Sequence, residues 1–244
     1  MLHKALCVLL LLQGFAAFAK EPDWGPYAAL LDAYVEPRPY QGGTVHWVHY
    51  SQMRQDPLFA QVVQSIESFP LTQLENDQEK LAFYINAYNI FAMKIVLQAW
   101  PMKSIKEAGS FIFPVWTKKI GIIDEKRVSL NHIEQTILPK FSEPRIHFAL
   151  NCASLSCPNL RQEPYIASKL ENQFQDQIKH FLNDPFKGIE KKGNHLSLSK
   201  IFQWYESDFK RYGGVATFVN QYYPLQVGEV LTADLPYHWQ LNGD

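Results

Sequence analysis

The stretch that decides the fold is residues 76–100, which read NDQEKLAFYINAYNIFAMKIVLQAW. Asn76 with Glu79 three residues later is a capping-box start, and Pro101 stops the helix that this stretch predicts. Beyond the first turn the only charged residue is Lys94. A helix that is apolar nearly all round is buried, so we expect residues 76–100 to form the central helix of the fold.

The sequence on either side predicts shorter helices and strands in no strict alternation. The helical segments are 27–34, 56–69, 131–139, 163–183 and 200–210, and the extended segments are 45–53, 115–123 with 127–130, 145–152, a hairpin turning at 193–194, and 236–241. Helices outnumber strands. We therefore expect an α+β fold, mainly helical, with a small antiparallel sheet around the buried central helix.

The first twenty residues have the pattern of a secretory signal peptide. Lys4 precedes an apolar run, and residues 17–19 form an A-x-A cleavage site. A membrane anchor is the alternative, but only about ten strongly apolar residues precede Gln13, whereas a spanning helix needs roughly 20. We expect residues 1–19 to be removed on export to the periplasm or the medium, which leaves residues 20–244 as a single globular domain.

Composition limits the partners of residues 20–244. They carry 22 basic and 24 acidic side chains, a net charge of −2, so nothing overall points to nucleic acid or to an anionic membrane surface. With 47% hydrophobic and 14% aromatic residues the chain can build a sizeable core. We expect no nucleic acid, no cofactor and no membrane insertion of this part of the chain; a small molecule or a peptide is the expected kind of ligand.

Two asparagines stand on one face of the predicted central helix. Asn86 and Asn89 are three residues apart, and a buried carboxamide without a partner costs about 1–3 kcal/mol. They could tie down neighbouring backbone. They could also line a polar ligand pocket, to which Tyr84 and Tyr88 would add hydroxyl groups.

The second group of polar residues follows Arg145. If 145–152 is a strand, alternation places His147 and Asn151 on one face and Cys152 on the other. His147 and Asn151 could then converge on a ligand, while a direct pair of His147 and Cys152 is weakened.

Three interpretations of Cys152 and Cys157 compete. A local disulfide would close a six-residue ring and stabilise the fold by roughly 2 kcal/mol. A thiolate nucleophile near an imidazole would make a hydrolase or acyltransferase. Inert thiols or a metal site are the third interpretation, but a fourth ligand beside His147 and the two cysteines is missing, so we expect no metal site.

Other polar and aromatic residues have ordinary structural explanations. Glu134 fits a helix cap. His238, beside Trp239, could complete a site built from distant segments, but it fits a surface or hydrogen-bonded histidine better. The aromatic stripe of Phe202, Trp204, Tyr205 and Phe209 is more typical of a core than of a ligand site.

Five motifs in this order resemble the domain of unknown function 547 family, over residues 80–242. The motifs are FYINAYN (83–89), SLNHIE (129–134), HFALNCASLSCP (147–158), FQWYESDF (202–209) and PYHWQLN (236–242). That family tends to have an acidic residue where this chain has His238. A fainter similarity is to papain- and transglutaminase-like thiol enzymes, but Asn86 and Asn89 stand where such an enzyme would have its cysteine.

These observations leave two hypotheses about function. The first is a binding module in which Asn86, Asn89 and His147 face one shared cavity and the cysteines form a disulfide. The second is a hydrolase or transferase acting on an amide, ester or thioester, with His147 as general base and Cys152 or Cys157 as nucleophile.

Overall fold

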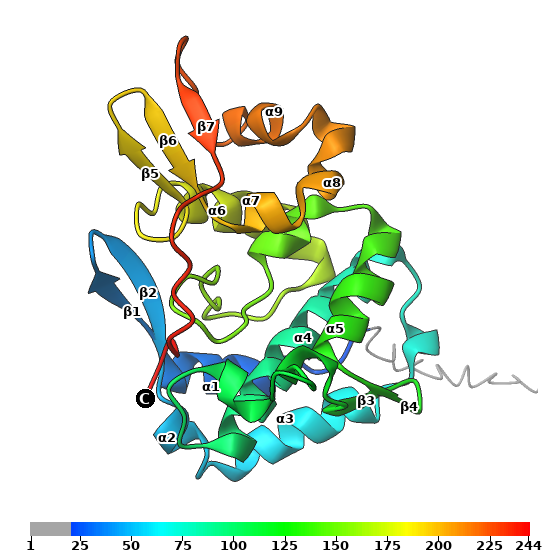
Figure 1. Ribbon diagram of the computed structural model, residues 1–244. Coiled ribbons are helices and arrows are strands. Elements are labelled where there is room, and N and C mark those ends of the chain that lie inside the picture. Colours follow the sequence, from blue (N-terminus) through cyan, green and yellow to red (C-terminus); the bar gives the residue numbers. More distant parts are fainter. Residues whose placement is uncertain (1–20) are drawn as a thin grey trace, which may run out of the picture.

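The fold is organised around helix α4 (Asp77–Ala99) in a computed structural model that describes residues 21–244 (Figure 1). The expected signal peptide therefore lies outside the described residues. Asn76 caps α4 by accepting a hydrogen bond from the N–H of Glu79 (2.9 Å), and the Glu79 carboxylate accepts one from the N–H of Glu75 (2.6 Å). The N-cap predicted at Asn76 is present, with the return bond of Glu79 going to the N–H of Glu75, one residue before Asn76. The predicted buried helix is also present.

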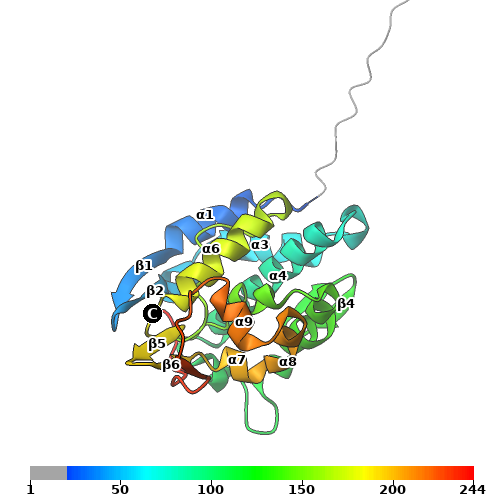
Figure 2. The same cartoon turned by 90° about the horizontal axis from the view of Figure 1, so that it is seen from above.

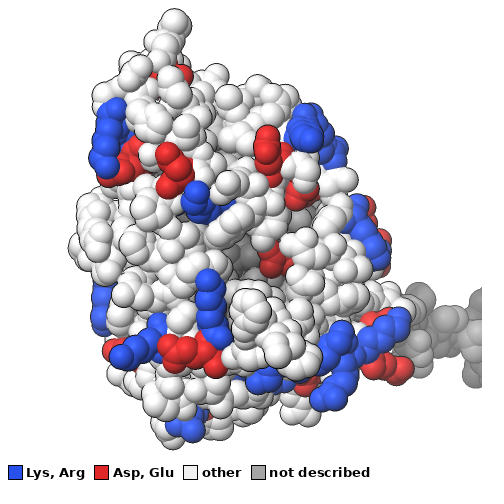
Figure 3. Space-filling model, in the orientation of Figure 1, with Lys and Arg blue, Asp and Glu red and all other residues white. Residues whose placement is uncertain are grey.

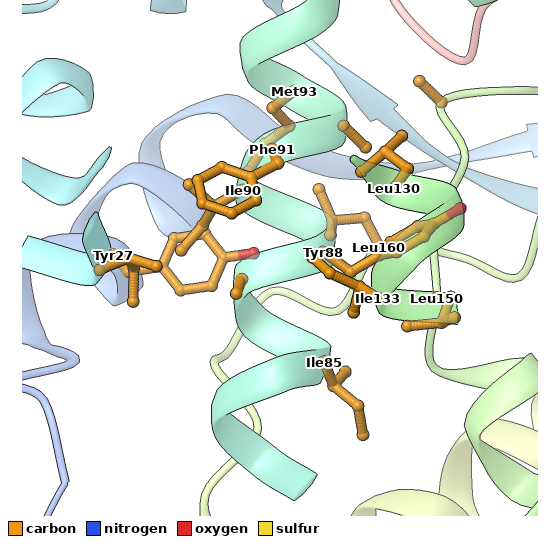
Figure 4. Close-up of a cluster of buried hydrophobic side chains, with 14 of the residues drawn as sticks. Tyr27, Ile85, Tyr88, Ile90, Phe91, Met93, Leu130, Ile133, Leu150 and Leu160 are labelled. Carbon is orange, nitrogen blue, oxygen red and sulfur yellow. The ribbon is translucent and has the colours of Figure 1, made fainter. Parts of the chain in front are cut away.

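The first hydrophobic cluster surrounds α4 on several sides. The helices that contribute to it are α1 (Gly25–Tyr34), α2 (Tyr50–Met53), α3 (Pro57–Glu67) and α5 (Leu130–His132), the last continued by a π-helical turn, Ile133–Ile137. Figure 4 shows Tyr27 on one side of α4 and Leu130, Ile133 and Leu150 on the other. Burial on opposite sides explains why the helix carries so few charges.

A second hydrophobic cluster lies beside the first and is built from later residues. Its helices are α6 (Leu170–Leu182), α7 (Ile201–Trp204), α8 (Glu206–Phe209) and α9 (Val215–Asn220). Phe148 belongs to this cluster, whereas its neighbours Ile146 and Ala149 belong to the first. The segment around residue 147 therefore runs along the seam between the two clusters.

The strands of residues 21–244 form three small sheets. Two are antiparallel hairpins, β1 (Val35–Tyr40) with β2 (Gly43–Val48), and β3 (Gly121–Ile123) with β4 (Lys126–Val128); the third has the order β5 (Ile189–Lys192), β6 (His195–Leu198), β7 (Val230–Thr232). β5 and β6 are antiparallel, and β7 runs parallel to β6. The expected fold class, α+β and mainly helical, is confirmed.

Short 3-10 turns connect these elements. They are η1 (Leu71–Gln73), η2 (Ile105–Ala108), η3 (Val115–Thr117), η5 (Leu138–Phe141), η6 (Pro144–Phe148), η7 (Ala167–Lys169) and η8 (Lys210–Tyr212).

Several sequence predictions of regular structure are wrong in whole or in part. The expected extended segment 45–53 ends in helix α2, and the expected strand 115–123 begins as the 3-10 helix η3. The expected strand 145–152 is the 3-10 helix η6 followed by an irregular loop, because Pro144 begins a helical turn and Glu143 caps it through the N–H of Arg145 (3.1 Å). The expected helix 200–210 is broken at Tyr205, and the expected strand 236–241 is irregular.

The C-terminal segment ties distant parts of the chain together. It leaves β7 and runs down the molecule to β2 and α2 (Figure 1). Leu241 bridges to Ser154, and Gly243 bridges to Val48. This path lays residues 236–240 across the loop that contains both cysteines.

A buried lysine, Lys187, joins the segment after α6 to Asn159, whose Oδ1 also accepts from the N–H of His46 in β2. Its side chain is 1% exposed, and its Nζ donates to Asn159 Oδ1 (2.5 Å) and lies 4.0 Å from Asp184 Oδ2. Burial lowers the pKa of Lys187 to about 8.

This shift of the Lys187 pKa predicts a change of stability with pH. Between about pH 8 and 10.5 the unfolded chain binds a proton that folded Lys187 does not, so its contribution to the free energy of unfolding rises with pH, by up to about 1.4 kcal/mol per pH unit. Urea unfolding of the native protein and of Lys187→Met at pH 7, 8.5 and 10 measures how this contribution to the free energy of unfolding changes with pH. The native protein should gain stability relative to the variant across this range, and a constant difference would refute the shift.

Candidate functional site

His147 is held in place by one aromatic and one acidic side chain, both from the region of α7 and α8. Its ring stacks on Tyr205, with 3.8 Å between ring centroids and 21° between planes. Its Nε2 donates to Asp208 Oδ2 (2.8 Å), and this hydrogen bond lowers the pKa of Asp208. Asp208 therefore orients the imidazole, and the sequence did not single it out.

Glu134 stands beside His147 and accepts hydrogen bonds from two phenols. The hydroxyl of Tyr88 donates to Oε2 (3.1 Å), and the hydroxyl of Tyr205 donates to Oε1. Burial, followed by the charge of Glu134, raises the pKa of both tyrosines, so both hydroxyls stay protonated and donate. The cap expected of Glu134 belongs to Ser129, whose Oγ accepts from the N–H of His132 (3.1 Å).

Aromatic side chains form a wall of a cavity that Glu134 also lines. Trp204 ends α7, Trp116 lies in η3, and Tyr237 and Trp239 come from the C-terminal segment. Ring centroids are 4.6 Å apart for Tyr237 and Trp239 and 5.8 Å apart for Trp204 and Trp239. Lys106 Nζ lies 3.6 Å from the ring centroid of Trp239, so this ring already makes a cation–π contact within the protein.

The loop 151–158 closes on itself through a disulfide. Cys152 and Cys157 are bonded, so the structure has the local disulfide among the three interpretations that the sequence left open. The Tyr237 hydroxyl lies 3.3 Å from Cys152 Sγ and 3.4 Å from Cys157 Sγ. Asn151 points into this loop, where its Nδ2 donates to Pro158 O (2.8 Å) and its Oδ1 accepts from the N–H of Ala153 (2.9 Å). Asn151 therefore shapes the loop and does not pair with His147.

Two adjoining cavities of about 210 Å³ each meet at Glu134, His147 and Leu150. We call the one between Glu134 and the aromatic wall the aromatic cavity. Its lining residues are Tyr88, Trp116, Asn131, Glu134, Gln135, His147, Leu150, Cys152, Cys157, Pro158, Ile201, Trp204, Tyr205, Tyr237 and Trp239. The face of the molecule between α7 and α5 is hollowed, and acidic and basic side chains are interspersed around it (Figure 3).

Comparison with known families assigns the central part of the chain. The model of the family described as "Protein of unknown function, DUF547" matches residues 71–182. Residues 71–182 are a DUF547 domain. No curated protein matches the chain, and no solved structure does. The resemblance to the family is thus confirmed, while the fainter similarity to papain- and transglutaminase-like enzymes stays a prediction.

The candidate site is built from the DUF547 domain and from the residues that follow it. Glu134, His147 and the disulfide lie within the matched segment, whereas Asp208 and Trp239 lie beyond its end. Residues after 182 therefore complete the wall of the aromatic cavity and orient His147.

Asn86 and Asn89 of the DUF547 domain bind backbone and line neither cavity that meets at His147. Asn86 exchanges two hydrogen bonds with Tyr165, from Nδ2 to its O (2.7 Å) and from its N–H to Oδ1 (2.9 Å). Asn89 Nδ2 donates to Ala149 O (3.0 Å), and its Oδ1 accepts from the N–H of Asn151 (2.8 Å). The structure therefore does not bring the two asparagines into either of the cavities that His147 lines, and their hydrogen bonds go to main-chain atoms.

Of the other residues that the sequence analysis named, one lines the aromatic cavity and two lie away from it. Tyr88 lines the aromatic cavity, but Tyr84 packs against Phe141 at the edge of the first cluster. His238 stacks on Phe186, with centroids 5.0 Å apart, and lines neither cavity. Within residues 21–244, no group of three or more His, Cys, Asp or Glu side chains is placed to hold a metal ion.

The aromatic stripe of 202–209 has two different roles. Phe202 and Phe209 are buried in the second cluster, as the sequence predicts. Trp204 and Tyr205 line the aromatic cavity instead, at the break between α7 and α8, and Tyr205 binds Glu134.

Proposed function

We propose that this chain is a binding module, and that its aromatic cavity takes a small organic ligand, or the end of a peptide, that carries an amine. The observation that supports this proposal most strongly is the charge of the residues that line the aromatic cavity. Glu134 is the only Asp, Glu, Lys or Arg among the residues of the aromatic cavity. A cationic group is the charged ligand that such a lining favours.

The geometry of Glu134 supports an amine as the group it receives. A carboxylate offers about four acceptor positions, and Tyr88 and Tyr205 use two of them. The remaining positions can accept hydrogen bonds from an ammonium group, and charge-assisted hydrogen bonds of this kind are the stronger ones.

The aromatic wall supports the same ligand. Indole rings attract cations through their π faces, and Trp116 and Trp204 provide two, while the ring of Trp239 already has Lys106 over it. The contact of Lys106 with Trp239 is an example within the protein. A volume of about 210 Å³ suits a ligand of one ring and a short amine arm rather than a long chain.

Calorimetric titration with benzylamine tests the proposal, with benzyl alcohol and benzoate as neutral and anionic probes of similar shape. We expect benzylamine to bind at roughly 1 mM, since eight non-hydrogen atoms at about 0.5 kcal/mol each give about 4 kcal/mol. Glu134→Gln should weaken it at least about tenfold, because a charge-assisted hydrogen bond is lost. Glu125→Gln, at an exposed turn, is the matched control. Equal binding of all three probes would contradict the proposal.

A second candidate function follows from the disulfide. His147, bonded to Asp208, lines the same cavity as Cys152 and Cys157, and a thiol with an imidazole and a carboxylate is the residue set of thiol hydrolases. The bonded cysteines carry no thiolate, so such an activity would require reduction. Iodoacetamide labelling after mild reduction distinguishes the two functions. Fast labelling of one thiol below pH 7 favours the enzyme, and slow labelling of both favours the binding module.

A further inference from the structure

The loop between η2 and η3 presents three consecutive apolar side chains to solvent. Phe111, Ile112 and Phe113 are 103%, 77% and 74% exposed. Figure 2 shows this loop standing away from the body of the molecule. We call residues 109–114 the apolar loop. Contiguous exposed apolar side chains mark a surface that meets a partner.

Internal contacts fix the shape of the apolar loop. The N–H of Ser110 donates to Phe113 O (2.9 Å), and the N–H of Phe113 donates to Ser110 Oγ (3.0 Å). At its neck the chain closes tightly, since a Cβ on Gly109 would come within 2.3 Å of the nitrogen of Val115. The tip is therefore a closed turn that carries its apolar side chains outward.

Exposed lysines flank the apolar loop on both sides of the chain. Lys103 precedes it, Lys118 and Lys119 follow it, and all three are exposed. Within residues 21–244 none of the three forms an ion pair with a carboxylate. Between residues 103 and 119 the only acidic side chain is Glu107. Residues 103–119 thus carry four lysines and one acidic side chain around the apolar tip, although residues 20–244 as a whole carry a net charge of −2.

We propose that the apolar loop docks the protein on an anionic phospholipid surface. Phe111, Ile112 and Phe113 enter the boundary between headgroups and acyl chains, and Lys103, Lys118 and Lys119 bind the headgroup phosphates. This is peripheral attachment: no helix in the described part of the chain is long and apolar enough to cross a membrane.

The small size of the tip favours lipid over a protein partner. A stable protein interface buries about 800 Å² on each partner, whereas three large side chains supply at most roughly 600 Å². A lipid surface needs no matching shape, and its negative charge complements lysines on both sides of the tip. Neither property depends on what the aromatic cavity binds.

Sedimentation with lipid vesicles tests this docking. Protein beginning at Lys20 keeps both hydrophobic clusters and lacks the apolar residues 1–19, which could bind lipid by themselves. We expect it to bind phosphatidylglycerol vesicles at low salt, to bind phosphatidylcholine vesicles much less, and to be released as the salt concentration rises.

Variants identify the residues responsible. Replacing Phe111, Ile112 and Phe113 by serine should weaken the partition onto phosphatidylglycerol at least about tenfold, and each of Lys118→Ala and Lys119→Ala should weaken it about fivefold. Val227→Ser is the matched control, because Val227 is an exposed apolar residue (107%) far along the chain. An unchanged urea midpoint shows that each variant is folded.

Three outcomes would overturn the proposal. They are absence of binding to phosphatidylglycerol at low salt, equal binding by the triple serine variant, and a loop-dependent complex with itself or another protein without vesicle binding.

Discussion

Replacing Phe148 by alanine is expected to lower the free energy of unfolding by about 3–5 kcal/mol. Phe148 is fully buried at the end of η6, and its ring lies 5.3 Å from Phe181, 5.6 Å from Phe202 and 5.9 Å from Phe218. Alanine would leave a cavity among rigid rings that cannot close over it. Urea unfolding followed by circular dichroism measures the loss.

The matched control for this change is Phe111→Ala. Phe111 is fully exposed in the apolar loop, so the same substitution should change stability by less than about 0.5 kcal/mol. If Phe148→Ala lowers the free energy of unfolding by no more than Phe111→Ala does, the packing of Phe148 does not stabilise the second cluster.

Asn89→Ala is expected to lower the free energy of unfolding by about 2–6 kcal/mol. The substitution leaves Ala149 O and the N–H of Asn151 without partners in a buried region, and each unpaired group costs about 1–3 kcal/mol. The same two groups set the path of the chain from η6 into the disulfide loop. Urea unfolding under oxidising conditions keeps the disulfide intact and isolates this effect.

Gln98→Ala is the control for Asn89→Ala. Gln98 is a carboxamide on the same helix, but it is exposed near the helix end, so its loss should change stability by less than about 0.5 kcal/mol. Equal stabilities of the two variants would show that Asn89 does not hold the backbone of 149–151.

The elements that could be predicted are those whose signals are local. The N-cap at Asn76, the stop at Pro101 and the turn at Gly193 are all decided within a few residues, and the structure has each of them. The disulfide was one of several open interpretations, since close spacing permits a bond but does not require it.

The wrong strand at 145–152 has a physical explanation. Ile146, Phe148 and Leu150 alternate with polar or small residues, as they would in a strand. In the structure the alternation has another cause, because Ile146 packs into the first cluster and Phe148 into the second. A segment buried on two sides gives the same pattern, and His147 is left to face the cavities.

The candidate site itself could not be assembled from the sequence. Its members come from segments more than 100 residues apart, from Glu134 to Trp239, and only the topology brings them together. In the sequence, Glu134 was already explained as a helix cap. Nothing in the sequence around Asp208, which follows the aromatic stripe, indicated a functional role for it. The asparagines of α4 gave the clearest polar signal, yet their partners are main-chain atoms that no side-chain pattern shows.

The most direct test of the proposed function is an NMR titration of the indole N–H signals with benzylamine. The chain has six tryptophans; Trp116, Trp204 and Trp239 line the aromatic cavity, and Trp24, Trp47 and Trp100 do not. We expect benzylamine to shift the first three signals, to leave the other three in place, and to lose its effect in Glu134→Gln, while benzoate shifts none. Shifts spread evenly over all six, or equal shifts with benzoate, would contradict an amine site at Glu134.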